Sequence, residues 1–305
     1  MHLHPLRIGI LGTDTSHAPA FAALLNQNAP GPGLEGARIT DAVPGFSADI
    51  PCSASRHAGF TRTLQTRDGV RLHPHVASMA PHVDAFILHS IDGRKHRSEL
   101  ELLLPFRKPV FVDKPFAASL ADAIWMFSAA ESANVPVFSA SAYRFYPSFQ
   151  EVLRQDVGRI FHAQSVGPCH LEPSHPDLFW YGIHAAEALF AILGPDCECV
   201  HRTSTADTDV VTGRWKNGAT GILTGLRAGP MPHGVCVYGE NGTVVQAPSG
   251  NTAFGAADDY TALVTAVVGF FRSGIAPVPP RETLALFAFL EAAEKSKTSG
   301  RTEWV

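Results

Sequence analysis

Short apolar runs alternate with helical patterns along the first half of the chain. The runs predict strands, because each is brief and almost continuous in apolar residues, and several end at Gly or Pro. They cover residues 6–11, 37–43, 83–89, 109–113 and 135–141. Helical patterns lie between them at 18–26, 99–104 and 119–133. Apolar strands that alternate with helices predict a parallel, doubly wound sheet that is covered on both faces.

The pattern changes after Tyr143. Asn217-Gly218 and Glu240-Asn241-Gly242 are typical of hairpin turns. The segments around them have the composition of strands, and helical patterns follow; the strands cover residues 157–166, 208–225 and 235–245, and the helices 176–193, 260–272 and 281–296. The second half therefore predicts an α+β domain with an open, mainly antiparallel sheet.

The chain has 305 residues, which exceeds the usual size of one domain, so we expect two domains. The change of pattern places the boundary after residue 142. The predicted fold class is α/β, with a Rossmann-like doubly wound sheet in residues 1–142 and the α+β domain in residues 143–305. An alternative for the last helix is that it packs back on the first domain.

Composition narrows the class of protein. Apolar residues make up 45% of the chain and charged residues 17%, the balance of a compact globular protein. The net charge is −4 and no run of Lys or Arg is present, so nucleic acid is not an expected partner. No apolar stretch approaches the roughly 20 residues that span a bilayer, and no cleavable signal pattern is present, so we expect a cytoplasmic protein without a membrane partner.

The cysteines do not indicate a disulfide framework, because there are five of them, scattered along the chain. Cys197 and Cys199 have one residue between them, less than zinc sites use. The run from Cys169 to His175 contains imidazole, thiol and carboxylate groups, but Pro173 interrupts it and no strict motif is present. We expect reduced thiols and no metal site.

A series of short motifs occurs in a fixed order along the chain. In these motifs and their spacing, the chain resembles the Gfo/Idh/MocA family, named for glucose-fructose oxidoreductase and inositol dehydrogenase. The motifs are Ile8-Gly9-Ile10-Leu11-Gly12, Val83-Asp84-Ala85, His96, Val112-Asp113-Lys114-Pro115, Arg144-Phe145-Tyr146-Pro147, Gly182-Ile183-His184, Gly239-Glu240-Asn241-Gly242-Thr243 and Pro277-Val278.

The resemblance implies an oxidoreductase that uses NAD or NADP. Such an enzyme transfers a hydride between the nicotinamide and a hydroxyl group of a sugar, polyol or sugar acid. The resemblance also implies a homodimer or homotetramer that pairs through the open sheet of the second domain.

Lys114 is the first candidate catalytic residue. It follows a predicted parallel strand, and ligands of doubly wound sheets bind at the carboxyl ends of the strands. Pro115 then ends the strand because it lacks a backbone N–H. The resemblance implies that Lys114 hydrogen-bonds a substrate hydroxyl next to the nicotinamide; the alternative is a solvated lysine at a strand end.

His184 is the second candidate catalytic residue, at the start of a predicted helix. An imidazole, with an ordinary pKa near 6.5, takes and returns a proton near neutral pH. The resemblance implies that His184 accepts the hydroxyl proton while hydride leaves the same carbon. Because the chain has fifteen histidines, the alternative is a histidine packed in the core.

The loop after the first strand departs from the dinucleotide fingerprint. Glycines there let the backbone approach the pyrophosphate, yet Asp14 and His17 occupy the second and third glycine places. A carboxylate at that position repels phosphate. One alternative is that the backbone N–H groups at the helix start and the hydroxyls of Thr13, Thr15 and Ser16 donate hydrogen bonds to a phosphate. Another is that Asp14 or Ser16 serves only to cap the helix.

The resemblance implies cofactor contacts in this loop and beyond it. The end of the second strand carries Pro44-Gly45-Phe46 instead of an acid or a base, so the preference between NAD and NADP stays open. The candidate cofactor-binding residues are Gly12, Thr13, Asp14, Thr15, Ser16, His17, Ser90, His96 and Asp113.

The segment before His184 also departs from the family pattern. Trp180 stands where an acid is common, so either an aromatic wall faces the substrate or the aromatic residues are core. Asp177 is a candidate substitute partner for His184. The candidate substrate-binding residues are Arg144, Asp177, Trp180 and Tyr181.

Two alternative functions follow from the altered loop. One is a lyase or isomerase on the same fold that retains its cofactor or needs no hydride transfer. The other is a non-catalytic sugar-binding module, because fold alone does not determine function.

Overall fold

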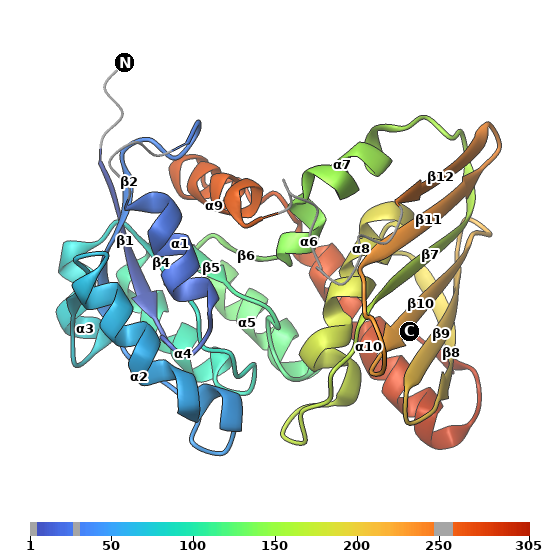
Figure 1. Ribbon diagram of the computed structural model, residues 1–305, viewed down its shortest axis with the longest axis horizontal. Coiled ribbons are helices and arrows are strands. Elements are labelled where there is room, and N and C mark those ends of the chain that lie inside the picture. The colour runs from blue at the N-terminus through green and yellow to red at the C-terminus, as the bar shows by residue number, and fades with distance from the viewer. Residues whose placement is uncertain (1–4, 27–30, 247–258) are drawn as a thin grey trace. The chain divides into compact units, whose positions relative to one another are not determined.

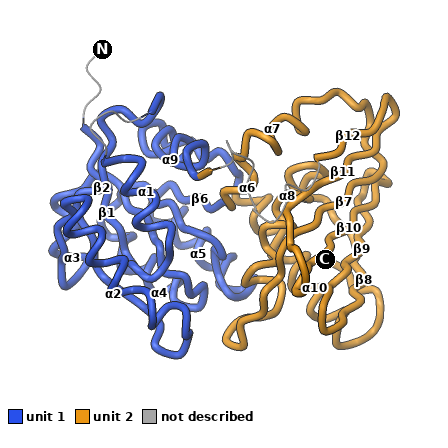
Figure 2. Tube along the Cα trace, in the orientation of Figure 1, with its two compact units in different colours: residues 1–140, 260–279 blue, residues 141–259, 280–305 orange. Residues whose placement is uncertain are grey.

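The computed structural model describes residues 5–26, 31–246 and 259–305, and the chain divides into two compact units (Figures 1 and 2). Unit 1 comprises residues 1–140 and 260–279, and unit 2 comprises residues 141–259 and 280–305. Helix α9 (Thr261–Ser273), although it lies near the C-terminus, belongs to unit 1. The last helix, α10 (Pro280–Ser299), belongs to unit 2.

Unit 1 is built on a six-stranded parallel sheet in the order β3-β2-β1-β4-β5-β6. The strand order reverses between β1 and β4, which is the switch point where doubly wound sheets bind ligands. Every residue of β4 and β5 is buried, as expected for a sheet covered on both faces. The strands are β1 (Leu6–Leu11), β2 (Ala37–Val43), β3 (Arg71–Leu72), β4 (Ala85–Leu88), β5 (Val110–Val112) and β6 (Val137–Ser139).

The helices of unit 1 form two groups, in which α1 packs against α2 and α9, and α4 packs against α5 (Figure 1). Ser119 caps the start of α5, because its Oγ accepts from the Asp122 N–H at 3.1 Å and donates to the Asp122 carboxylate at 2.9 Å. Besides α9, the helices are α1 (His17–Leu25), α2 (Pro51–Thr66), α3 (Val76–Met79), η1 (Ala80–His82), α4 (His96–Leu103), η2 (Leu104–Phe106) and α5 (Leu120–Ser132).

Unit 2 contains a seven-stranded mixed sheet in the order β12-β11-β7-β10-β9-β8-β13. All neighbours are antiparallel except β7 and β10, which are parallel. The strands are β7 (Ile160–Pro168), β8 (Cys197–Ser204), β9 (Thr208–Trp215), β10 (Thr220–Leu226), β11 (Gly234–Gly239), β12 (Gly242–Gln246) and β13 (Glu303–Trp304).

Helices cover one face of this sheet, because α8 packs on β7 and β10 and α10 packs on β8. Besides α10, the helices of unit 2 are α6 (Ala142–Phe145), α7 (Pro147–Arg154), the π-helical turn η3 (Leu178–Gly182) and α8 (Ile183–Leu193). No helix in the described part of the chain is both long and apolar enough to cross a membrane.

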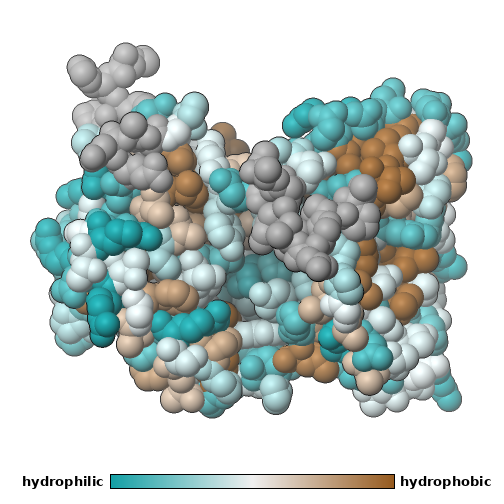
Figure 3. Space-filling view, in the orientation of Figure 1, coloured by the Kyte–Doolittle hydropathy of each residue, from teal (hydrophilic) through white to brown (hydrophobic). Residues whose placement is uncertain are grey.

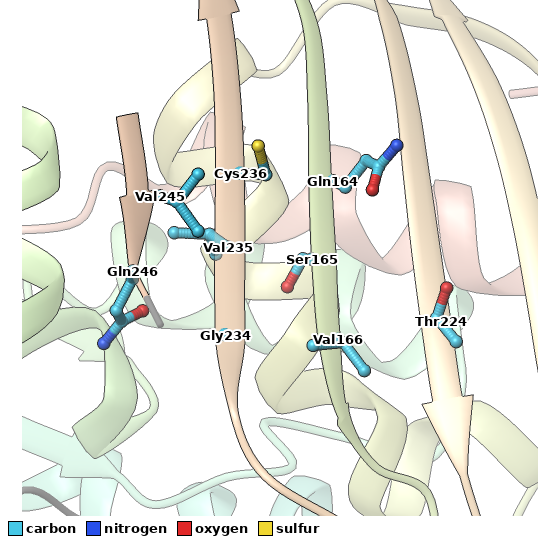
Figure 4. Close-up of a pocket in the computed structure, with 9 residues that line it drawn as sticks. All are labelled: Gln164, Ser165, Val166, Thr224, Gly234, Val235, Cys236, Val245 and Gln246. Atoms are coloured by element: carbon cyan, nitrogen blue, oxygen red, sulfur yellow. The ribbon is translucent and has the colours of Figure 1, made fainter. Parts of the chain in front are cut away.

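The other face of the sheet carries exposed side chains. Apolar surface lies over β11 and β12 in Figure 3, and Val245 of β12 is 61% exposed. A hollow of about 200 Å³ lies over strands β12, β11, β7 and β10, and its lining residues include Cys236, Gln164 and Thr224 (Figure 4). Both units match the predicted fold class, which is therefore confirmed.

Candidate functional site

Gly12 makes the turn that follows β1. Its φ is +89°, and a β-carbon at this position would lie 2.4 Å from the backbone nitrogen of Ser90, so only glycine fits. The backbone N–H of Gly12 donates to Val43 at 3.1 Å, and that of Thr13 donates to Gly45 at 3.2 Å. The turn is thereby attached to the end of β2, and the first glycine place of the fingerprint keeps its usual geometry.

Asp14 points into the protein. Its side chain is fully buried, and its two oxygens accept from Ser53 Oγ at 2.6 Å and from the Ile91 N–H at 3.1 Å. It therefore does not cap α1, and that interpretation of Asp14 is wrong, whereas its effect on a bound phosphate stays a prediction. Ser16 stands at the N-cap of α1 but makes no side-chain capping bond, so capping by Ser16 is also wrong.

The three hydroxyl side chains of the loop, Thr13, Thr15 and Ser16, differ in their contacts and exposure. Thr13 Oγ1 is bonded to Thr61 Oγ1 of α2 at 2.7 Å, and Thr15 is buried with its hydroxyl 3.4 Å from the His17 N–H. Only the Ser16 side chain is exposed. The loop is held by interactions with distant segments, while the start of α1 lacks a side-chain cap.

Three titratable side chains meet at the carboxyl edge of the unit 1 sheet. Asp113 Oδ2 lies 2.6 Å from His17 Nδ1 and 3.1 Å from His89 Nδ1, and its Oδ1 accepts from the Lys114 N–H at 2.8 Å. Burial alone would raise the pKa of Asp113, but His17 and His89 outweigh it and hold that pKa well below its usual range. Burial lowers the pKa of His89, against the opposing effect of Asp113, which favours a neutral ring.

Ser90 and His96 bind other parts of unit 1. Ser90 Oγ donates to Glu99 Oε1 at 2.8 Å. The two ring nitrogens of His96 lie 2.6 Å from the Ser90 carbonyl oxygen and 3.2 Å from that of Phe116. These contacts fasten the segment after β4 to the segment after β5, so both side chains are occupied within the protein.

Lys114 directly follows Asp113 and β5, at the edge of the sheet where ligands bind. The residue is only 9% exposed, which differs from an ordinary solvated lysine. Its peptide bond to Pro115 is cis.

His184 lies in the first turn of α8 and is bonded to Ser141, which precedes α6. His184 Nδ1 is 2.6 Å from Ser141 Oγ, and the same hydroxyl oxygen accepts from the Tyr143 N–H at 3.2 Å. A hydroxyl oxygen has two lone pairs, so it can accept from both donors. In that tautomer Nδ1 carries hydrogen and Nε2 is the nitrogen that takes a proton.

Glu187 connects Ser141 to Arg144. Its two oxygens accept from the Ser141 N–H at 2.7 Å and from Arg144 Nε at 3.1 Å. Burial raises the pKa of Glu187, and Arg144 and the Ser141 N–H oppose that shift. Arg144 also pairs with Glu282, so its guanidinium serves an ion-pair network inside unit 2 and not an open binding surface.

Asp177 does not bond to His184. It pairs with Arg202 at 3.0 Å and with Lys297, in a network that also includes Asp209 and Glu294. The hypothesis that Asp177 replaces the missing acid beside His184 is therefore wrong, because Ser141 occupies Nδ1.

Aromatic rings surround His184. The Tyr181 ring lies 5.4 Å from the His184 ring and 5.1 Å from the His170 ring, whereas Trp180 is buried against His175 at 4.8 Å. Tyr181 is thus the predicted aromatic residue that accompanies the candidate base, and Trp180 is packed in the core.

Sequence reasoning missed His233 in this cluster. Its ring lies 5.8 Å from that of His184 and is stacked on Tyr143 at 4.6 Å. Burial lowers the pKa of His233 to about 4, and its Nδ1 is buried without a hydrogen-bond partner in the described part of the chain.

Ser141 and Glu187 were missed as well. A serine directly before a short helix and a glutamate three residues after His184 were the available signals, but their partners lie 43 and 46 residues away in sequence. Among the described residues, no three His, Cys, Asp or Glu side chains are grouped as metal ligands. Burial raises the pKa of the Cys169 thiol to about 11, which keeps it protonated.

Solved structures share this architecture along the whole chain. A scyllo-inositol dehydrogenase from Lactobacillus casei has a TM-score of 0.79 at 16% identity, covering 100% of this chain and 99% of that one. An oxidoreductase from Agrobacterium radiobacter, solved with NAD+, L-tartaric acid and magnesium, has a TM-score of 0.76 at 18% identity and 98% coverage of both chains. A myo-inositol 2-dehydrogenase from Lactobacillus plantarum has a TM-score of 0.78 at 16% identity, with 99% of both chains covered.

At these identities the likeness establishes the fold. No model of a known protein family matches the sequence, and no curated protein matches it.

Proposed function

We propose that this chain is an NAD- or NADP-dependent oxidoreductase that acts on a hydroxyl group of a cyclic polyol, sugar or sugar acid. The observation that carries the proposal is the position of Lys114, a mostly buried ammonium at the carboxyl end of β5 in a sheet with the strand order of dinucleotide-binding proteins. Two structural neighbours named as inositol dehydrogenases and one solved with NAD+ support the same class.

The residues of unit 1 fit a dinucleotide. The Gly12 turn removes the side chain that would block close approach of a phosphate, and the positive end of the α1 dipole follows the same loop. The Asp14 carboxylate, which would repel that phosphate, is buried and hydrogen-bonded elsewhere.

The chemistry divides between a proton and a hydride. When bound, the nicotinamide supplies the acceptor for the hydride that leaves the carbon bearing the hydroxyl. His184 is the candidate base, acting through Nε2 in the tautomer whose Nδ1 donates to Ser141, and the Lys114 ammonium is the candidate hydrogen-bond donor to a substrate oxygen. The carbon loses two electrons and becomes a carbonyl.

Turnover with a panel of inositols, aldoses and sugar acids tests the proposal. We expect NAD+ or NADP+ to be reduced in step with carbonyl formation, and deuterium at the reacting carbon to appear in the reduced nicotinamide. Conversion of a substrate without net or transient reduction of the dinucleotide would instead identify a lyase or isomerase. Binding of sugars with no conversion would identify a binding module.

A further inference from the structure

We propose that His233 is a substrate-binding residue of unit 2, which donates a hydrogen bond through Nε2 to a carboxylate oxygen of the substrate. The substrate class is then a sugar acid, one of the three classes that the proposed oxidoreductase would accept, so the inference rests on the proposed function. His233 would thereby determine the preference for an acid over a neutral polyol.

His233 lies next to the candidate base. It precedes Gly234, the first residue of β11, and its ring packs on Gly167 of β7. The ring is stacked on Tyr143 with centroids 4.6 Å apart, and it meets the His184 ring edge-on at 5.8 Å. Because the two imidazoles are neighbours, a substrate whose hydroxyl contacts His184 can present the adjacent group to His233.

Neither ring nitrogen of His233 is hydrogen-bonded within the described residues. The residue is only 8% exposed, and Nδ1 is buried without a partner. Nε2 is not one of the fully buried atoms, so it is the polar end of the ring that a ligand can reach. Buried polar groups without partners cost stability, and an apolar ring would stack on Tyr143 without that cost. An imidazole at this position is therefore explained by ligand binding and not by packing.

The packing of His233 favours the tautomer with hydrogen on Nε2. A β-carbon at Gly167 would lie 2.8 Å from Nδ1, so this nitrogen is pressed against the β7 backbone. Buried N–H groups without an acceptor are rarer in proteins than acceptors with an unused lone pair. Burial lowers the pKa of His233 to about 4, so the ring is neutral near neutral pH and carries one hydrogen. That hydrogen makes Nε2 a donor.

The charges around the candidate base suit an anionic substrate. A donor at Nε2 needs an acceptor oxygen, and its bond to an ionised acceptor is stronger than its bond to a neutral hydroxyl. The carboxylates that flank the base in sequence are already paired, Glu187 with Arg144, and Asp177 with two cationic side chains. Where the family pattern has a further acid, this chain has the buried Trp180. A substrate carboxylate therefore gains the hydrogen bond without repulsion from these positions.

Calorimetric titration with matched acids and neutral compounds tests the inference. The pairs are D-gluconate with D-glucitol, D-galactonate with galactitol, and D-glucuronate with D-glucose. Within each pair a carboxylate replaces one alcohol group. NADH or NADPH is present in parallel titrations, because a reduced dinucleotide prevents oxidation of the ligand. We expect the wild type to bind at least one acid about tenfold or more tightly than its neutral partner.

Two variants separate the hydrogen bond from packing. His233→Phe keeps a ring beside Tyr143 and removes both nitrogens. Its affinity for the acid should fall about tenfold or more, while its affinity for the neutral partner and its melting temperature should not fall. His233→Gln places an amide near the position of Nε2 and should recover part of the loss. The exposed His75→Phe is the matched control and should bind like wild type.

Three results would overturn the inference. One is a wild type that binds no acid more tightly than its neutral partner, or that binds none of these compounds. Another is equal affinity of the wild type and folded His233→Phe for the acid. The third is an equal loss of affinity for the acid and the neutral partner in His233→Phe, which would indicate a packing role. If His233→Phe does not fold, His233→Asn replaces it in the same comparison, because its amide is too short to reach the position of Nε2.

Failure of the proposed function has a different signature. A wild type that binds the acid through His233 but reduces neither NAD+ nor NADP+ keeps the acid site and removes the oxidoreductase. A wild type that oxidises neutral polyols, with a rate that His233→Phe leaves unchanged, keeps the oxidoreductase and removes the acid site.

Discussion

Ser141 orients the ring of His184 through Nδ1. Its hydroxyl lies 2.6 Å from Nδ1, and its own backbone N–H is fixed by the buried Glu187. An imidazole oriented through one nitrogen presents the other in a defined direction, as a general base requires. The orientation comes from a hydroxyl here, whereas the sequence suggested a carboxylate.

Oxidation at low substrate concentration should rise with pH through the neutral range, because the unprotonated His184 ring accepts the hydroxyl proton. His184→Asn should flatten this limb of the kcat/KM profile, and Ser141→Ala should lower kcat about tenfold while keeping the limb. A limb that persists unchanged in His184→Asn would assign the base to another group.

Lys114 differs from the solvated lysine that was the alternative interpretation of its motif, since it is 9% exposed. Lys114→Met retains most of the apolar stem and removes the ammonium, so we expect kcat/KM to fall about a hundredfold or more, the usual cost of losing one electrostatic stabiliser. The melting temperature should change by a few degrees only. Lys216→Met is the matched exposed control. Near wild-type turnover in folded Lys114→Met would contradict the role.

His233 makes stability depend on pH. Its pKa in the folded protein is about 4, below the unfolded value near 6.5, so the unfolded chain binds a proton that the folded chain does not in the range between them. Stability is therefore lost as pH falls from about 6.5 towards 4, by about 3 kcal/mol in total. Denaturant unfolding of His233→Asn should show a shallower decline over this range than wild type. Parallel declines would mean that His233 is protonated in the fold.

At the scale of elements, the regular pattern of apolar residues was enough to predict most strands and helices of both units. Helix α2 was missed because only Ser53 and Leu64 of its sixteen residues are buried, which leaves too weak an apolar stripe to detect. Strand β8 was missed because its alternation is broken by a bulge between Cys197 and Cys199.

The loops of the site were less predictable than the elements that they connect. The sequence identified Gly12 as a turn, since glycine tolerates its φ of +89°. It did not identify the partners of Asp14 or His17, which lie 39 to 96 residues away, because a local pattern carries no information on long-range hydrogen bonds. Lys114 and His184 were predicted from motifs, whereas their surroundings required the structure.

Asp14 therefore acts on the stability of the loop. Asp14→Ala leaves the Ile91 N–H without its partner and should lower the free energy of unfolding by about 2 kcal/mol, the usual cost of a buried donor left unpaired. Dinucleotide affinity should fall or stay the same. A tighter complex in Asp14→Ala or Asp14→Asn would show that the carboxylate opposes the phosphates after all.

At the scale of the whole molecule, the two units supply different parts of the proposed reaction. Unit 1 carries the dinucleotide features and Lys114, and unit 2 carries His184 with Ser141 and Glu187. The exposed face of the unit 2 sheet, where Val245 is 61% exposed, is where the predicted homodimer or homotetramer would pair. That assembly stays a prediction.

The most direct test of the proposed function is the melting temperature of the wild-type chain with NAD+, NADH, NADP+ and NADPH, each titrated to saturation. A ligand that binds only the folded state stabilises it by about 2.7 kcal/mol at a hundredfold excess over Kd. We predict a saturable rise of about 5 °C or more with at least one of the four dinucleotides, with one site per chain by calorimetry. A folded protein whose melting temperature responds to none of them would contradict the account.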